Sequence, residues 1–174
     1  MSCTLALDLA TVTGFAIAKP PYAPAPSPVE RAAGTAMPQR FSGSKSFQSY
    51  SGNLGMVFDK FESWLGEMVT VHQPDMIVFE APFVGAVRNA NTARMLFGFC
   101  SLTEMVTFRR GVRVLECNNS IIKKHATGNG NAPKGSMIKA ARDMGWNPKD
   151  DNEADALWLA DYAAAMRQAK GGAA

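Results

Sequence analysis

The chain has 174 residues, of which 47% are hydrophobic and 19% charged, and its formal net charge is +3. This size and composition fit one globular domain that can bury a sizeable core. No stretch reaches the roughly 18 apolar residues of a membrane span and no charged-then-apolar leader follows Met1, so we expect a cytoplasmic protein. The three cysteines lack CxxC spacing, which argues against a zinc knuckle or a disulfide framework and indicates reduced thiols.

The first third of the chain predicts two strands followed by a proline-rich insertion. Apolar runs at residues 5–9 and 15–18 flank Thr13-Gly14, which indicates two strands joined by a tight turn at that dipeptide. Residues 19–28 hold five of the ten prolines, so we expect an extended insertion within the domain over about residues 19–32. A short strand is expected at 33–37, and the Ser- and Gly-rich stretch 42–51 favours no element.

The remaining sequence alternates helical and strand patterns. Apolar residues at three- and four-residue steps predict a helix over 54–68, and the solid apolar run 76–79 is typical of a strand buried on both faces. A helix at 91–108 follows, and then another buried strand at 112–115. After it we expect a short helix that Asn118 or Asn119 caps and that runs to Lys124. Helices are then expected at 133–145 and 151–169. The order predicts one α/β domain over residues 1–174, with a disordered tail at 170–174.

Charge is distributed unevenly along the second half of the chain. Residues 109–149 contain nine Lys or Arg and two acids, whereas residues 150–174 contain five acids and two basic residues. A basic stretch of this kind favours a polyanionic partner, and on charge alone a solvated charged face explains it equally well.

Three acids occupy unusual positions: Asp8 lies inside an apolar strand, Glu80 ends a buried strand, and Asp155 lies in the first turns of the last helix. Each alone has a structural explanation, as a turn residue, a partner of a buried Arg, or a helix N-terminal charge. Together they predict a site, because buried carboxylates need partners and the carboxyl ends of strands are where α/β domains build sites. Oxygen ligands without a His/Cys cluster favour Mg²⁺ or Mn²⁺, and two such ions suit phosphoryl displacement.

Five segments resemble, in order, the motifs of RuvC-type Holliday junction resolvases. They are Asp8–Gly14, Ile77–Phe83, Asn89–Arg94, Ile122–Lys134 and Asn152–Leu157, and they extend the resemblance from about residue 4 to 165. The resemblance implies an RNase H-like fold with a central mixed sheet flanked by helices. It also implies a divalent-metal-dependent endonuclease that makes paired cuts in four-way and other branched DNA during recombination and repair. A homodimer is implied too, and we expect the helix from Asn91 to form its seam.

The resemblance assigns metal-binding and catalytic roles to Asp8, Glu80 and Asp155. The family usually has a fourth acid, or a His, three residues before the last acid, and here that position is Asn152. Asn152 can ligate through its carbonyl oxygen, or Asp151 or Glu153 can substitute for it. We favour Asp151, because Glu153 is two residues from Asp155 and so lies off its helix face.

The resemblance also assigns DNA contacts. Phe83 corresponds to an aromatic residue that stacks on bases, although a core position is the alternative. Phosphate contacts are assigned to Lys123, Lys124 and Lys134, with Arg88 and Arg94 as weaker candidates. The proline-rich insertion departs from the bacterial pattern and resembles the diverged phage and prophage members.

Three other functions share some of these features. An RNase H-like ribonuclease that cuts hybrid or structured RNA uses the same acids. A non-catalytic junction-binding protein would explain Asn152 as a sign of a degenerate site. An actin-like ATPase also has an Asp before a Thr-Gly turn, but it needs a far longer, two-lobed chain.

Overall fold

The computed structural model describes residues 3–19, 26, 40–48, 52–82 and 89–171. Within them, five strands form one sheet in the order β3-β2-β1-β4-β5. The strands are β1 (Thr4–Asp8), β2 (Val12–Ala18), β3 (Arg40–Ser46), β4 (Met76–Glu80) and β5 (Arg113–Cys117). The pairs β1–β2 and β2–β3 are antiparallel and the pairs β1–β4 and β4–β5 are parallel, so the sheet is mixed.

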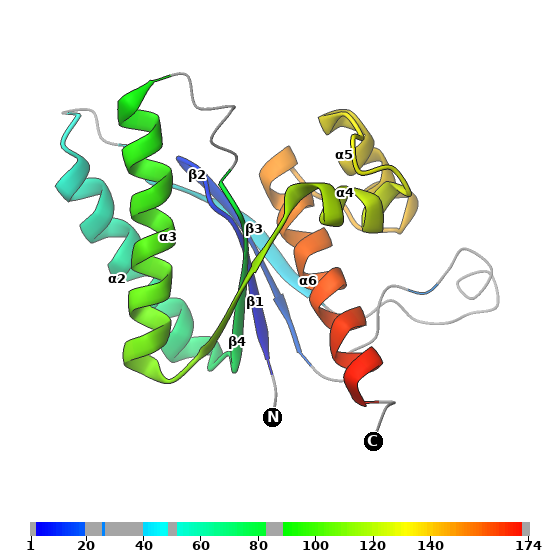
Figure 1. The fold of residues 1–174 in the computed structure, drawn as a ribbon, viewed down its shortest axis with the longest axis horizontal. Helices are drawn as coiled ribbons and strands as arrows, with labels where there is room; N and C mark the ends of the chain where they lie inside the picture. The colour runs from blue at the N-terminus through cyan, green and yellow to red at the C-terminus, as the bar shows by residue number, and fades with distance from the viewer. Residues whose placement is uncertain (1–2, 20–25, 27–39, 49–51, 83–88, 172–174) are drawn as a thin grey trace.

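In the described part of the chain, five helices cover the two faces of this sheet (Figure 1). They are α2 (Leu54–His72), α3 (Ala90–Arg110), α4 (Asn119–Thr127), α5 (Lys134–Asp143) and α6 (Asp151–Gly171). Helices α2 and α3 lie on one face, and α6 lies on the other with α4 and α5 beside it. None of the helices in the described part of the chain is long and apolar enough to cross a bilayer.

Strand alternation sends side chains into two separate cores. Leu5 and Leu7 of β1 pack under α2 and α3, where the rings of Phe61 and Phe99 stack with centroids 4.3 Å apart. Ala6 lies on the opposite face, in a core whose α6 contribution is mainly alanine. These small residues let α6 lie close to the sheet.

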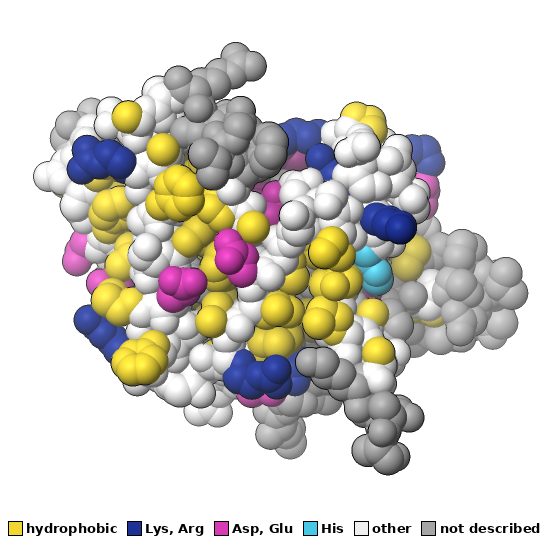
Figure 2. All heavy atoms as spheres, in the orientation of Figure 1, with side chains coloured by type: hydrophobic (Ala, Val, Ile, Leu, Met, Phe, Trp, Pro, Cys, Tyr) yellow, Lys and Arg dark blue, Asp and Glu magenta, His cyan; other side chains and the backbone are white. Residues whose placement is uncertain are grey.

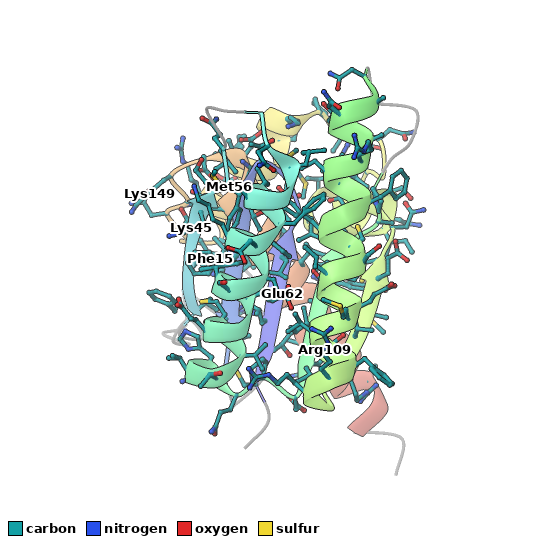
Figure 3. All side chains as sticks on the ribbon, turned by 90° about the vertical axis from the view of Figure 1, so that its left-hand side faces the viewer. Phe15, Lys45, Met56, Glu62, Arg109 and Lys149 are labelled. Atoms are coloured by element: carbon teal, nitrogen blue, oxygen red, sulfur yellow. The ribbon has the colours of Figure 1, made fainter. Side chains whose placement is uncertain are left out.

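Helices α2 and α3 pack side by side along the sheet (Figure 3). Across their outer surface Arg109 donates a 3.0 Å hydrogen bond to Glu62. Both side chains are well exposed, so this pair adds little stability, and the buried aromatic residues beneath it hold the two helices.

The predicted fold class is confirmed, but the turn between the first two strands is not where we predicted it. Thr13 and Gly14 lie within β2, where Gly14 pairs with Asp8, so the turn prediction is wrong. Residues 9–11 make the connection, and the Thr13 hydroxyl closes it by donating to the carbonyl of Ala10 at 2.7 Å. Thr13 and Gly14, a dipeptide typical of turns, therefore lie near the first residue of strand β2.

Strand β3 arises from the Ser- and Gly-rich stretch that favoured no element. Its serines face α6: Ser42 donates to Glu153 at 2.7 Å and Ser44 donates to Asp150 at 2.5 Å. The side chains of this edge strand that face α6 are polar, because they form hydrogen bonds with the start of that helix. The strand therefore lacks the alternation of apolar and polar residues by which a strand is predicted from sequence. The strand expected at 33–37 and almost all of the proline-rich insertion lie outside the described residues, and α6 continues to Gly171, into the tail expected from residue 170.

Candidate active site

Three elements bring Asp8, Glu80 and Asp155 to one edge of the sheet. Strands β1 and β4 are parallel neighbours with Leu7 opposite Phe79, so Asp8 and Glu80, the next residues, end the two strands side by side. Alternate side chains of each strand face α6, and the positions of Asp8 and Glu80 lie on that face of the sheet. Asp155 lies in the second turn of α6. The structure therefore places the three acids near one another at this edge, and their role as metal ligands stays a prediction.

The pKa values of the three carboxyl groups report this proximity. Burial raises the pKa of Asp8 well above its ordinary value, and the charges of Asp155 and Glu80 raise it further. Burial followed by the charge of Glu80 raises the pKa of Asp155 to about 7. Burial also raises the pKa of Glu80. Three acids that disfavour one another's ionised form need a cation to be charged together.

Helix α6 can lie close to Asp8 and Glu80 because the residue of β2 that it packs against, Gly14, has no side chain. A Cβ on Gly14 would lie 1.9 Å from the carbonyl oxygen of Asn152, so no side chain fits between the strand and the first turn of the helix. Asp150 caps that turn by accepting a 2.8 Å hydrogen bond from the backbone N–H of Glu153. The start of α6 is thus fixed on the strand that pairs with β1.

Glu80 is held by a residue that sequence analysis considered only as a helix cap. The true cap of α4 is Asn118, whose side chain accepts from the backbone N–H of Ser120 at 2.9 Å. Asn119, the next residue, donates its amide to Glu80 Oε1. No feature of the sequence marks Asn119 as a site residue, because its partner is 39 residues away.

Two lysines predicted to contact phosphate lie beside the acids. Lys134 donates a 2.9 Å hydrogen bond to Asp151, which raises the pKa of Lys134 and lowers that of Asp151. The negative charges of Asp155 and Asp8 raise the pKa of Lys134 further. The positive charge of Lys123 lowers the pKa of Glu80 and of Asp155.

The remaining predicted residues lie at different places. Lys124 is exposed on α4 and Arg94 is exposed near the start of α3. Glu153 is buried and accepts hydrogen bonds from Ser42 and from the backbone of Lys149, so it faces β3. Phe83 and Arg88 lie outside the described residues.

The chemistry of the candidate ligands suits a hard divalent cation, but their side chains do not form a metal-binding group in this structure. Among the described residues, no three or more Asp, Glu, His or Cys side chains are placed so that together they could hold a metal ion. Asp155 Oδ1 is nevertheless buried without a hydrogen-bond partner in that part of the chain, and an ion would satisfy it. All the candidate ligands are oxygens, as Mg²⁺ and Mn²⁺ prefer.

Comparison with known proteins identifies the family. A family profile described as crossover junction endodeoxyribonuclease RuvC matches residues 45–161, about two thirds of the chain. No curated protein sequence matches.

Solved structures share the fold. RuvC of Thermus thermophilus superposes with a TM-score of 0.71 at 15% identity, covering 96% of each chain. T. thermophilus RuvC in complex with a Holliday junction substrate gives 0.74 at 17%, covering 97% of each chain. The yeast mitochondrial Holliday junction resolvase Ydc2 gives 0.66 at 10%, covering 98% of this chain and 81% of that one. The family profile and the shared fold confirm the predicted resemblance: the chain belongs to the RuvC family of crossover junction endodeoxyribonucleases.

Proposed function

We propose that this endonuclease resolves four-way DNA junctions with Asp8, Glu80 and Asp155 as the ligands of one or two Mg²⁺ or Mn²⁺ ions. The observation that carries the proposal is the buried Asp155 Oδ1, which lacks a hydrogen-bond partner among the described residues and lies near two further, partly buried carboxyl groups, those of Asp8 and Glu80. A cluster of this kind is costly unless a cation completes it, and a nuclease that cuts phosphodiesters uses such a cation.

Each side chain at this edge of the sheet then has a distinct task. The three acids hold the metal, which supplies Lewis acidity for phosphodiester hydrolysis when it is bound. Asn119 fixes the orientation of Glu80 through its amide. Lys134 and Lys123 offset the negative charge of the acids and attract the phosphate that is to be cut.

We assign the fourth ligand position to Asp151. Its charge raises the pKa of both Asp8 and Asp155, so it belongs to the same electrostatic cluster. Glu153 is excluded from this role because its carboxylate is bonded to β3 and to the backbone of Lys149. Asn152 lies three residues before Asp155 and is the alternative ligand.

The proposed dimer seam at α3 is supported by exposed apolar side chains. Phe97 and Phe108 are 43% and 87% exposed, and their spacing of eleven residues, about three helical turns, places them on one face of α3. Val114 on the neighbouring edge strand β5 is 42% exposed. Figure 2 shows hydrophobic side chains on the surface over α3. A second copy of the chain would cover this surface and place two acid centres on one junction.

Cleavage of a synthetic four-way junction tests the proposal. Wild type, Glu80→Gln and the control Asp143→Asn, which changes a 62% exposed acid on α5, are incubated with Mg²⁺ or Mn²⁺ and the junction. Linear duplex, a flap and an RNA–DNA hybrid are compared under the same conditions. We expect paired, symmetric nicks on the junction with wild type and the control, and none with Glu80→Gln.

Other outcomes would replace the proposal. Cleavage of the hybrid but not of the junction would favour the ribonuclease alternative. Junction binding without cleavage of any substrate would favour a degenerate site with Asn152 at its fourth position.

A further inference from the structure

A second charged cluster lies inside the domain, on side chains that the acid centre does not use. Asp161 of α6 accepts a 2.7 Å hydrogen bond from Arg40, the first residue of β3, and lies 2.9 Å from Nε2 of His125 on α4. The side chains of Arg40 and Asp161 are 3% and 4% exposed, and that of His125 is 24% exposed. One carboxylate therefore joins three elements that are far apart in the sequence.

Aromatic rings enclose this cluster. The Arg40 guanidinium lies over the ring of Trp146 at 4.9 Å, and Trp146 meets Trp158 edge-on at 4.8 Å. The His125 ring packs edge-on against Trp158 and Tyr162. Trp158 in turn donates to the backbone carbonyl of Met137 on α5. The histidine side chain thus faces the interior, although the sequence placed it in a basic segment.

Stability alone does not explain a cluster of this kind. Removing the charges of Arg40 and Asp161 from water is costly, and apolar residues of similar volume often stabilise a core as well or better. What an ionic cluster adds is a fixed geometry between the elements it joins. Helix α4 needs such a fixing point, because it has only nine residues and its one buried side chain is Ile122.

The inner face of α4 carries Ile122 and His125 at a three-residue step, and Lys123 and Lys124 lie between them in sequence. At its N-terminal end α4 contacts the acid centre through Asn119 and Glu80. Towards its C-terminal end it contacts α6 through His125 and Asp161. Asp161 and Asp155 belong to the same helix, about 9 Å apart along its axis, so α6 carries both an active-site acid and the anchor of α4.

We propose that Asp161 is a positioning residue that fixes helix α4, and with it Lys123 and Lys124, relative to the acid centre. The pair His125–Asp161 sets the distance between the lysines and Asp155. The Asp161 carboxylate can be buried there because the positive charge of Arg40 neutralises it. The proposal rests on the proposed function in that the lysines are taken to contact junction phosphates.

His125→Phe is the variant of choice. It removes the bond to Asp161 but keeps a ring against Trp158 and Tyr162, and it leaves the Arg40–Asp161 pair intact, so the fold is expected to stand. His125→Gln is the conservative variant, because a Gln side chain can present an amide where Nε2 lies. His72→Phe is the matched control, since His72 stacks on Phe41 at the end of α2, which covers the face of the sheet opposite to α6 and Asp161.

Two readouts separate positioning from a general loss of structure. In hydrogen–deuterium exchange we expect the amides of residues 119–127 in His125→Phe to exchange at least about tenfold faster, while β1 and β4 stay protected. We expect junction affinity to fall about tenfold and the slope of log K against log salt to fall by about one to two, because the two lysines no longer meet phosphates together. His125→Gln should restore both, and His72→Phe should change neither.

Unchanged exchange in α4, or an unchanged salt slope and affinity in His125→Phe, would overturn the proposal. Equal loss of protection in α4 and in the sheet would also overturn it, because the histidine would then serve stability alone. If wild type does not bind the junction, the proposed function fails, and exchange of residues 119–127 alone decides whether His125 and Asp161 position the helix.

Discussion

The backbone of Gly14 lies against the carbonyl oxygen of Asn152 so closely that a Cβ on Gly14 would be 1.9 Å from that oxygen. Gly14 also pairs with Asp8 across β1 and β2. The missing side chain therefore sets how near the first turns of α6, and with them Asp155, can come to Asp8. A glycine that bears no reactive group is in this way part of the geometry of the acid centre.

Replacing Gly14 with Ala should separate the acids. The clash is with backbone atoms, which cannot turn aside as a flexible side chain can, so β2 or α6 must shift. We expect the free energy of unfolding to fall by roughly 1–3 kcal/mol, as for other overpacked sites. We expect junction cleavage to fall by about 100-fold, since a displacement near 1 Å has this effect on positioned groups.

Chemical denaturation and single-turnover cleavage measure the two effects of Gly14→Ala. Gly66→Ala in helix α2 is the control, because nothing lies within 4 Å of the added Cβ. An alanine at this position should raise the free energy of unfolding by up to about 1 kcal/mol. A Gly14→Ala protein with wild-type stability and activity would contradict the packing argument.

Asp8→Asn should abolish cleavage and leave junction binding largely intact, because the amide removes a proposed metal ligand and leaves the lysines unchanged. The same change should raise the Tm of the metal-free protein, since burial and the charges of Asp155 and Glu80 disfavour an ionised Asp8. Thermal unfolding with and without Mg²⁺, beside a gel-shift titration of the junction, checks both. Retained nuclease activity would remove Asp8 from the site.

The raised pKa of Asp155 gives the metal-free protein an unusual pH dependence. The folded-state pKa is about 7 and the ordinary value is 3.8, so between these values the native state binds more protons than the unfolded state. The contribution of Asp155 to stability therefore falls as pH rises from about 4 to 7 and then levels off, and the raised pKa values of Asp8 and Glu80 act in the same direction. Saturating Mg²⁺ should remove this fall, because a bound cation favours the ionised carboxylate.

Metal affinity should accordingly increase as pH rises to about 7. Below that pH, metal binding should release protons from the carboxyl groups that become ligands. Tm measured from pH 4.5 to 8.5, with and without Mg²⁺, and calorimetric titration of Mn²⁺ in two buffers of different ionisation enthalpy test this. A metal-free Tm that rises steadily across pH 4.5–7 would show that Asp155 is not held largely protonated in the native state.

The sequence predicted the helices and the buried strands β1 and β4 because these depend on local patterns and on the ends of apolar runs. The prediction that residues 112–115 form a buried strand was wrong in its burial, because β5 is the edge strand of the sheet and Val114 is 42% exposed. The sequence also failed where a residue's role comes from a partner far along the chain. Ser42 and Ser44 make β3 a strand by bonding to the start of α6, and Asn119 enters the site through Glu80. A pattern of nearby residues contains no information on such pairs.

Lys123 and Lys124, adjacent in sequence, should behave differently. Lys123 acts electrostatically on Glu80 and Asp155, whereas Lys124 is exposed. We expect each Lys→Ala change to weaken junction binding and to lower the salt slope by about one. We expect only Lys123→Ala to lower the single-turnover cleavage rate at saturating protein as well.

Binding isotherms at four salt concentrations and cleavage under saturating conditions distinguish the two lysines. Lys60→Ala, which changes an exposed lysine of α2, is the control. Equal effects of Lys123→Ala and Lys124→Ala on the cleavage rate would show that the proximity of Lys123 to the acids has no consequence for the reaction.

The fourth ligand can be decided by comparing Asp151→Asn with Asn152→Ala. Asp151 belongs to the electrostatic cluster of Asp8 and Asp155, and its carboxylate is bonded to Lys134, which must turn away when a metal competes for the oxygen. We expect Asp151→Asn to weaken Mn²⁺ binding at least about tenfold, in the range typical of lost ligand-shell groups, and Asn152→Ala to change it less than about twofold. Calorimetry on the DNA-free protein measures both. Weakened binding in Asn152→Ala alone would transfer the ligand to the Asn152 side chain and leave Asp151 as the partner of Lys134.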